Sequence, residues 1–390
     1  MRRFSIRKMT PEKAVVWIVA AYSLAVVIAS FQNWLLPLKQ VKGAFYTQYN
    51  NYVIFKQSFF HLINNQNLYE WYLTEQWDLF KYSPSFALIF VLFAFLPDLV
   101  GLTIWNGANA FLIVVGVLKL PQLKLSSKNK VLLFVLVELL TSMQNAQSNG
   151  LIVGLIILGF VCLESNRPLV GILAIVSTVF IKIFGILALL LLLFYPNKVK
   201  LAFYTAISFI IWLLLPLLVI SPAQLILQYQ NWWALLVADH SDSLGLSVMG
   251  WLAAWFDLHW NKSVIVMTGA LLLLAQFALA HRYKEFNYRL SMAASILVWM
   301  VIFNHKAESP TFIIAVVGAA IWYVAERRET IYAVLMAVLF VFTILSPTDV
   351  FPNYIQDNFF DPYVIKVVPC VLIWIALSYT IIFPGEGKKA

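Results

Sequence analysis

The sequence predicts an all-α, polytopic integral membrane protein with about 11–13 transmembrane helices and a long extracytoplasmic loop near its start. Of its 390 residues, 62% are hydrophobic and only 12% are charged, whereas soluble domains carry about 25% charged residues. Apolar runs of about 15–25 residues recur along the chain, and this is the length that crosses a bilayer as a helix. No segment has the composition of a soluble domain of about 100 residues, so residues 1–390 are predicted to form one membrane domain.

The positive charge of the chain favours membrane lipid, not nucleic acid, as the partner of its basic residues. The net charge is +9, and Lys and Arg lie at the ends of the apolar runs. The positive-inside rule and attraction to anionic lipid account for charges in those places. Cys162 and Cys370 lie within apolar stretches, so we expect buried free thiols, and no cluster of ligands predicts a metal site.

The N-terminal segment sets the orientation of the first span. Residues 1–13 carry five basic side chains, which predict a cytoplasmic start, and no small-residue cleavage pattern follows, which predicts a retained anchor. The span 14–36 then delivers the polar loop 38–83 to the outside. Within this loop, residues 50–64 have a mixed helical pattern that is too polar to span and is typical of an interfacial helix.

The path of the chain between residues 84 and 194 has two solutions. Simple alternation of spans places the basic segment 119–130 outside, against the positive-inside rule. The other solution makes residues 84–118 cross an odd number of times and divides the apolar run 168–194 into two short halves that meet near Lys182. We favour the division, because a bare Lys at mid-bilayer costs about 2.5–3.5 kcal/mol on insertion scales. The path of residues 84–118 stays open.

The remaining spans alternate so that every strongly basic short connection lies on the cytoplasmic side. A second extracytoplasmic loop, 221–262, is rich in Gln and Trp. The other apolar runs in this half are 201–220, 263–280, 290–303, 311–325, 331–345 and 367–383. No inverted repeat of the kind that many transporters use is present in the sequence.

Polar groups at membrane depth mark the candidate site. Four amides, Gln144, Asn145, Gln147 and Asn149, fall between two short apolar runs, and they either join helices or line a wet cavity. A lone lysine, Lys182, interrupts an apolar run, and a phosphate is a natural partner for its ammonium. The alternative for Lys182 is a side chain that extends to the interface.

Two charged segments lie at the predicted outer ends of spans. His305, Lys306 and Glu308 are packed into one short segment, which indicates anion binding or proton handling, with an ordinary charged loop as the alternative. Asp78 and Lys81 precede a proline that starts an apolar run, so we expect Asp78 at the membrane surface as a candidate general base. In mid-run, Glu138 is expected to pair with a neighbouring helix.

Together these motifs resemble the integral membrane glycosyltransferases of the C superfamily, and more narrowly glycosyltransferase family 87, whose members use polyprenol-phosphate-mannose. Segment 51–69 resembles the first-loop helix of that family, and Lys81-Tyr82-Ser83-Pro84 resembles its Tyr-x-Pro segment. Ala146-Gln147-Ser148-Asn149 resembles its Gly-Gln-x-Asn, and Lys182 resembles its lysine before a short span. A weaker similarity is Ser241-Asp242-Ser243-Leu244. The resemblance covers roughly residues 10–320.

The resemblance implies an inverting hexosyltransferase, with mannose as the expected sugar. A polyprenyl phosphate-sugar donor and a lipid or glycan acceptor would meet on the outer face of a bacterial inner membrane, with no nucleotide or other cofactor. The implied catalytic residues are Asp78, Asn51 and His305, and the implied substrate-binding residues are Lys81, Tyr82, Gln147, Asn149, Lys182, Lys306 and Glu308. One departure matters: the loop Asp of the family aligns best with Asn51, and an amide cannot take a proton at neutral pH. Either the alignment is shifted here, or another carboxylate such as Asp78 is the base, or the activity has changed or been lost.

Other classes remain as alternatives. A transporter or flippase of a lipid-linked or small anionic substrate would also carry polar groups in the membrane, but it would be expected to show repeats and matching broken helices. A polymerase or ligase of envelope polysaccharide would need a large external loop, usually nearer the middle or end of the chain. For a structural membrane protein without a ligand, a lysine beside an amide cluster is an expensive feature.

Overall fold

A computed structural model describes residues 10–238, 243–326 and 329–383, and it confirms the all-α membrane architecture. The basic N-terminal residues 2–8, the tail after residue 383, and Ser241 and Asp242 lie outside the described residues. The α-helices are α1 (Pro11–Leu35), α2 (Asn50–Ile63), α3 (Pro84–Ile89), α4 (Val91–Ala94), α5 (Asp98–Lys119), α6 (Leu125–Gln144), α7 (Asn149–Glu164), α8 (Pro168–Ile181), α9 (Lys198–Leu214), α10 (Pro222–Ala238), α11 (Val248–Phe256), α12 (Lys262–Phe277), α13 (Phe286–Ile302), α14 (Ile313–Ala325), α15 (Thr330–Leu339), α16 (Asn353–Ile355) and α17 (Val368–Ile382).

Shorter elements complete the described chain. The 3₁₀ helices are η1 (Ile183–Phe194), η2 (Leu215–Leu218), η3 (Ala280–Arg282), η4 (Ser309–Phe312) and η7 (Ile365–Val367), and the π-helices are η5 (Phe340–Leu345) and η6 (Gln356–Phe360). Strands β1 (Lys39–Val41) and β2 (Ala44–Tyr46) form an antiparallel hairpin in the first loop.

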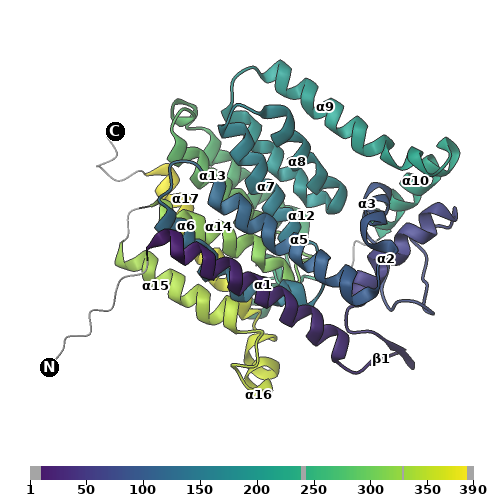
Figure 1. Ribbon diagram of the computed structural model, residues 1–390. Coiled ribbons are helices and arrows are strands. Elements are labelled where there is room, and N and C mark those ends of the chain that lie inside the picture. The colour runs from purple at the N-terminus through teal and green to yellow at the C-terminus, as the bar shows by residue number, and fades with distance from the viewer. Residues whose placement is uncertain (1–9, 239–242, 327–328, 384–390) are drawn as a thin grey trace.

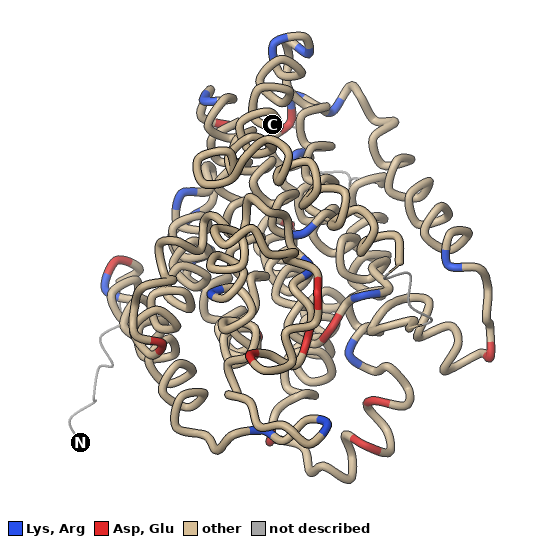
Figure 2. Tube along the Cα trace, turned by 90° about the vertical axis from the view of Figure 1, so that its right-hand side faces the viewer, with Lys and Arg blue, Asp and Glu red and all other residues tan. Residues whose placement is uncertain are grey.

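Among the residues that the structure describes, four helical stretches are long and apolar enough to cross a membrane by length and composition: Pro11–Leu35, Asp98–Lys119, Lys198–Leu218 and Ile365–Ile382. Eight further apolar helices in the same residues are shorter, between 10 and 17 residues. Charged residues are few along the helices (Figure 2). The number of actual crossings therefore stays a prediction.

The helices form a bundle with two different ends (Figure 1). Helix α1 runs from the end of the bundle where the described chain begins to the opposite end, where β1, α2, α3 and α10 gather. In the centre, α13 and α14 are buried along nearly their whole lengths. We call the end with β1, α2, α3 and α10 the loop end.

The first long loop is folded onto the bundle. The predicted helix at 50–64 is confirmed as α2, and it buries Tyr52, Phe55 and Phe59 against the bundle. At one side, Lys56 Nζ forms an ion pair with Asp98 Oδ1 at 2.7 Å, at the start of α5. The first loop therefore packs against this end of the bundle. Its last residues, 78–83, include candidate site residues.

The lengths of the helices between residues 84 and 118 bear on how often this segment can cross the membrane. Helices α3 and α4 break at Phe90, and the apolar stretch Pro84–Ala94 reaches only about 16 Å, less than the hydrocarbon core. Helix α5 is thus the one stretch between 84 and 118 that is long enough to span. This favours the topology with an odd number of crossings.

The predicted division of 168–194 is confirmed. Helix α8 ends at Ile181, and η1 begins at Ile183 and packs back along α8. A side chain at Gly185 would collide with the backbone of Thr178, so glycine permits this close return. The intervening residue, Lys182, has extended backbone angles (φ −139°, ψ 127°) and stands at the turn.

The second predicted loop, 221–262, contains two helices in its described residues, and its extracytoplasmic location stays a prediction. Helices α10 and α11 occupy most of its described residues. Gln228 on α10 is buried and clamps the first loop, since its Nε2 donates to Gln66 O at 2.6 Å and its Oε1 accepts from Leu68 N at 3.2 Å. Polar residues that seemed to mark a loop are here the contact face of a helix.

Candidate active site

The site is built on the sharp turn between α6 and α7. Helix α6 ends at Gln144 and α7 begins at Asn149, and the turn between them requires a positive φ of 48° at Ala146. The carbonyl oxygen of Ala146 accepts a hydrogen bond from Trp105 Nε1 at 3.0 Å. This anchored turn presents the side chains of residues 147–149 toward α8.

The amide cluster divides into two groups with different partners. Gln144 Nε2 donates to Gln32 Oε1 at 2.8 Å, and Asn145 Nδ2 donates to Thr141 O at 2.9 Å. The first bond joins α6 to α1, and the second lies within the last turn of α6. Gln147 and Asn149 instead direct their oxygens to a single atom, the ammonium nitrogen of Lys182, at 3.2 and 3.0 Å.

Lys182 is thus held by neutral groups. Among the described residues, no carboxylate lies within ion-pair distance of its Nζ; Glu308 and Lys81 are the charges that act on it from farther away. Its Nζ also lies 5.8 Å from the centre of the Tyr82 ring. The break between α8 and η1 places this cation beside the turn that joins α6 and α7, which we call the amide turn.

The end of the first loop supplies Tyr82. Its hydroxyl lies 3.5 Å from both Gln147 Oε1 and Ser148 Oγ, and burial raises the pKa of Tyr82 well above its usual value, so the phenol keeps its proton. Its neighbour Ser83 ties this segment to α8, because Ser83 Oγ donates to Phe180 O at 2.6 Å. The loop and α8 therefore position Tyr82 and Lys182 together.

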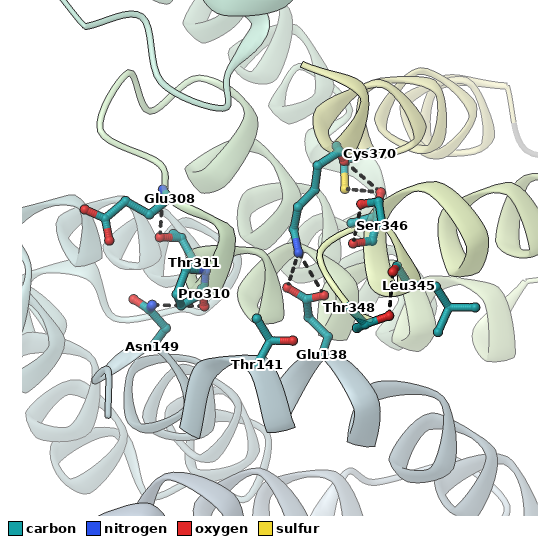
Figure 3. Close-up of polar contacts among 12 residues, drawn as sticks. Glu138, Thr141, Asn149, Glu308, Pro310, Thr311, Leu345, Ser346, Thr348 and Cys370 are labelled. Atoms are coloured by element: carbon teal, nitrogen blue, oxygen red, sulfur yellow. Dashed lines mark hydrogen bonds and ion pairs between the residues drawn. The ribbon is translucent and has the colours of Figure 1, made fainter. Parts of the chain in front are cut away.

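A third segment closes the site from the other half of the chain. Gln147 Nε2 lies 3.5 Å from Glu308 Oε2, and Asn149 Nδ2 donates to Pro310 O at 3.0 Å. Figure 3 shows Glu308, Thr311 and Pro310 on the stretch of chain that faces Asn149. Glu308 also caps η4 in a reciprocal hydrogen-bond pair with Thr311, which fixes its backbone.

Asp78 and Lys81 form an ion pair of 3.4 Å at the rim, with each side chain about two fifths exposed. Both the ion pair and the hydrogen bond from Leu79 N use Oδ1 of Asp78. The Asp78 charge acts on Tyr82, and the Lys81 charge acts on Lys182. Asp78 and Lys81 therefore do not contact the Lys182 ammonium directly. They flank the Lys182 network, by which we mean Tyr82, Gln147, Asn149, Lys182 and Glu308.

Asn51 contacts the turn between α6 and α7. Its Nδ2 donates to Asn145 O at 2.9 Å, so it fastens α2 to that turn. Among the described contacts, none joins Asn51 to Lys182. The geometry gives Asn51 the position of an anchor.

His305 and Lys306 lie on the same segment as Glu308. Lys306 N donates to Asn304 Oδ1 at 2.9 Å, and the carbonyl oxygen of Ala307 accepts from Leu246 N at 3.0 Å. Within the described part of the chain, the contacts of the Lys182 network reach Glu308 and Pro310 of this segment. Nor do the described residues contain a group of three His, Cys, Asp or Glu placed to hold a metal.

The arrangement brings five of the expected site residues into one network: Tyr82, Gln147, Asn149, Lys182 and Glu308. Ser148, which contacts Tyr82, was missed although it lies inside the motif. The expected partner of Glu138 is Lys366, whose Nζ lies 2.9 and 3.1 Å from the two carboxylate oxygens. A fixed cation, amide oxygens around it and carboxylates at the rim can bind an anionic leaving group beside a proton acceptor.

Comparison with known proteins agrees with this chemistry. The sequence model of glycosyltransferase family 87 matches residues 80–347, which is more than half of the chain. The match includes every residue of the Lys182 network and leaves Asn51 and Asp78 outside its limits. A search of curated proteins finds no match. The chain belongs to glycosyltransferase family 87, a family of membrane glycosyltransferases.

Proposed function

We propose that this glycosyltransferase moves a hexose, with mannose the first sugar to test, from a polyprenyl phosphate donor to a hydroxyl group of a lipid or glycan acceptor. The reaction would occur on the outer face of a bacterial inner membrane. The observation that carries the proposal is Lys182, an ammonium at the break of an apolar run whose hydrogen-bond partners are the neutral amides of Gln147 and Asn149. A cation without its own carboxylate suits an anion that arrives with the substrate.

The leaving group of such a donor is a phosphate attached to a lipid. As the bond between the sugar carbon and the phosphate oxygen breaks, negative charge grows on that oxygen. A fixed ammonium at this point stabilises the transition state more than the ground state, because the negative charge that it faces grows as the bond breaks. The amide oxygens of Gln147 and Asn149 keep the ammonium in place before the donor binds.

An apolar groove below the site supports a prenyl-linked donor. A cavity of 460 Å³ lies between the end of η1 and the face of α9, and its lining is almost entirely apolar. At its upper end, Phe209 packs against Phe180 with ring centres 5.9 Å apart, two residues before Lys182. The groove extends from this end along α9 to Lys198, so a prenyl chain that enters it at Phe209 would carry its phosphate on the side of the Lys182 ammonium.

We assign the general base to Asp78. Glu308, the other carboxylate near the network, is engaged in capping η4 and lies against Gln147. Asp78 uses Oδ1 for both its ion pair and its hydrogen bond. Its Oδ2, on a partly exposed side chain at the rim, is therefore the atom that would accept the proton of the acceptor hydroxyl. Asn51 would then anchor α2, and a catalytic role of His305 and phosphate binding by Lys306 stay predictions from the sequence.

The step balances without a cofactor. The acceptor oxygen forms a bond to the anomeric carbon while the bond from that carbon to the phosphate oxygen breaks. The electron pair of the broken bond leaves with the polyprenyl phosphate, and the acceptor proton passes to Asp78. Attack opposite the leaving group inverts the anomeric configuration.

The test is transfer from radiolabelled polyprenyl phosphate-mannose by purified protein, with Asp78→Asn and Glu308→Gln as matched amide variants. We expect transfer by the wild type, a loss of about 100-fold or more in Asp78→Asn, and a smaller loss in Glu308→Gln. A larger loss in Glu308→Gln would move the base to Glu308.

No transfer with mannose, glucose or galactose donors would count against the function itself. Movement of labelled donor across a vesicle membrane without sugar transfer would favour the flippase alternative.

A further inference from the structure

A second cavity lies near the site, between the end of α11 and the start of α12. Its volume is 370 Å³, at the lower end of the range for small-ligand sites. The walls combine apolar side chains from one segment, Leu244 and Met249, with a second segment that carries His259, Trp260 and Asn261. The proposed donor chemistry does not use this cavity.

We propose that this cavity is a carbohydrate subsite that holds a hexose unit of the acceptor. The proposal rests on the proposed function, because it names the class of acceptor that the transferase would use. A hexose presents an apolar ring face and a rim of hydroxyl groups. The cavity offers the complementary set, with an indole and aliphatic walls for the ring face and polar side chains for the hydroxyls.

Trp260 is the proposed platform for the sugar ring. It lines the cavity and is 58% exposed, so much of its surface is accessible. Beside it, His259 is held by Asp257, with His259 Nε2 3.0 Å from Asp257 Oδ1. Asn261 caps α12 by accepting from Ser263 N at 2.8 Å, which fixes the polar edge of the cavity.

The cavity is joined to the Lys182 network by a backbone contact. Leu246 N donates to Ala307 O at 3.0 Å, and a side chain at Gly245 would collide with the carbonyl oxygen of His305. Gly245 also has a positive φ of 55°, which favours glycine at this crossing. The wall that carries Leu244 therefore lies directly on the segment that presents Glu308 to Gln147.

This geometry separates two roles. The Lys182 network would hold the phosphate and the sugar being transferred, and the cavity would hold a sugar already present in the acceptor. Replacement of Trp260 should then weaken binding of the acceptor and leave binding of the donor unchanged. Trp233 on α10 provides a matched control, since it is 65% exposed and is not part of the cavity wall.

The first experiment measures binding of octyl mannoside and octyl glucoside, below micelle formation, to the full chain in nanodiscs. Octyl glycerol ether serves as the probe without a sugar. We expect the wild type and Trp233→Ala to bind at least one alkyl hexoside more tightly than the ether. In Trp260→Ala this preference should fall about five- to ten-fold, and in His259→Ala by a smaller factor.

The second experiment measures release of mannose from radiolabelled polyprenyl phosphate-mannose to water, in the absence of acceptor. We expect equal release by the wild type, Trp233→Ala and Trp260→Ala. Absence of release and transfer in all three would contradict the proposed function, whereas the binding result stands independently. Equal binding of hexosides and ether by the wild type, or an unchanged preference in Trp260→Ala, would overturn the carbohydrate subsite.

Discussion

Two lysines next to apolar helices, Lys366 and Lys182, have opposite surroundings. The Lys366 ammonium lies 2.9 and 3.1 Å from the two oxygens of Glu138, a side chain with no exposure, and 5.2 Å from the Phe312 ring centre. Among the described residues, the Lys182 ammonium has amide oxygens as its hydrogen-bond partners, and Glu308 acts on it from beyond ion-pair distance. Lys366 thus has a carboxylate in direct contact, whereas the groups in direct contact with the Lys182 ammonium are neutral and orient it.

The two regions are neighbours, which makes the difference informative. Figure 3 shows Glu138 and Thr141 on the same helix, with Pro310 and Asn149 to one side and Cys370 to the other. Helix α6 carries Glu138 and continues to the amide turn, and Phe312 belongs to η4 beside Glu308. The ion pair therefore braces the elements on which the Lys182 network is built.

The largest expected effect comes from breaking the Glu138–Lys366 pair. Glu138→Gln or Lys366→Met leaves one buried charge without its partner, so we expect a loss of about 3–5 kcal/mol of stability. The double variant Glu138→Leu/Lys366→Met should recover most of it. Thermal unfolding in detergent measures the difference. Singles as stable as the wild type would show that the pair does not brace the fold.

Lys182→Met is the second way to test the comparison. Removing the ammonium takes a charge away from the departing phosphate, so kcat/KM for transfer should fall about 100- to 1000-fold. Stability should stay the same or rise, because no carboxylate loses a partner among the described residues. Lys182→Arg keeps the charge and should retain part of the activity. A variant that unfolds as readily as Lys366→Met would make Lys182 a structural lysine.

Gln147→Leu sharpens the comparison by removing one amide from the ammonium. The expected loss in kcat/KM is about 10-fold, the lower end for a hydrogen bond to a charged group. Gln144→Leu is the matched control, because the Gln144 side chain faces Gln32 on α1. Equal losses in the two variants would mean that the amides act only as joints between helices.

The smallest effect concerns the turn that carries Gln147. Ala146 is fully buried and has a φ of 48°, a region that costs a residue with a side chain about 1–2 kcal/mol. Ala146→Gly should therefore raise stability by about 1 kcal/mol, with transfer unchanged. Lower stability would indicate that packing of the Ala146 methyl group against its neighbours outweighs the strain.

Much of the fold followed from local patterns in the sequence. The lengths of the apolar runs predicted the helices. The cost of Lys182 at mid-bilayer predicted the break between α8 and η1. One short motif identified Gln147 and Asn149 as site residues, and both contact Lys182. These inferences depend on residues that are close in sequence. Helix α10 was missed because its polar residues are contact groups, and composition alone cannot separate such groups from a wet loop.

Partners that are distant in sequence could not be predicted. Glu138 was expected to find a partner, but Lys366 lies 228 residues away and no periodicity connects them. Glu308 and Gln147 are likewise 161 residues apart. The contact of Asn51 with Asn145 O depends on how α2 packs against the bundle, and local sequence does not determine this packing.

The most direct test of the role of Lys182 is equilibrium binding of a polyprenyl phosphate and of the matching uncharged polyprenol. Both ligands carry the same chain, so their difference reports the phosphate contact alone. We predict that the wild type binds the phosphate at least 10-fold more tightly and that Lys182→Met binds both alike. An undiminished preference for the phosphate in Lys182→Met would contradict the claim that this lysine is the counter-charge of the donor.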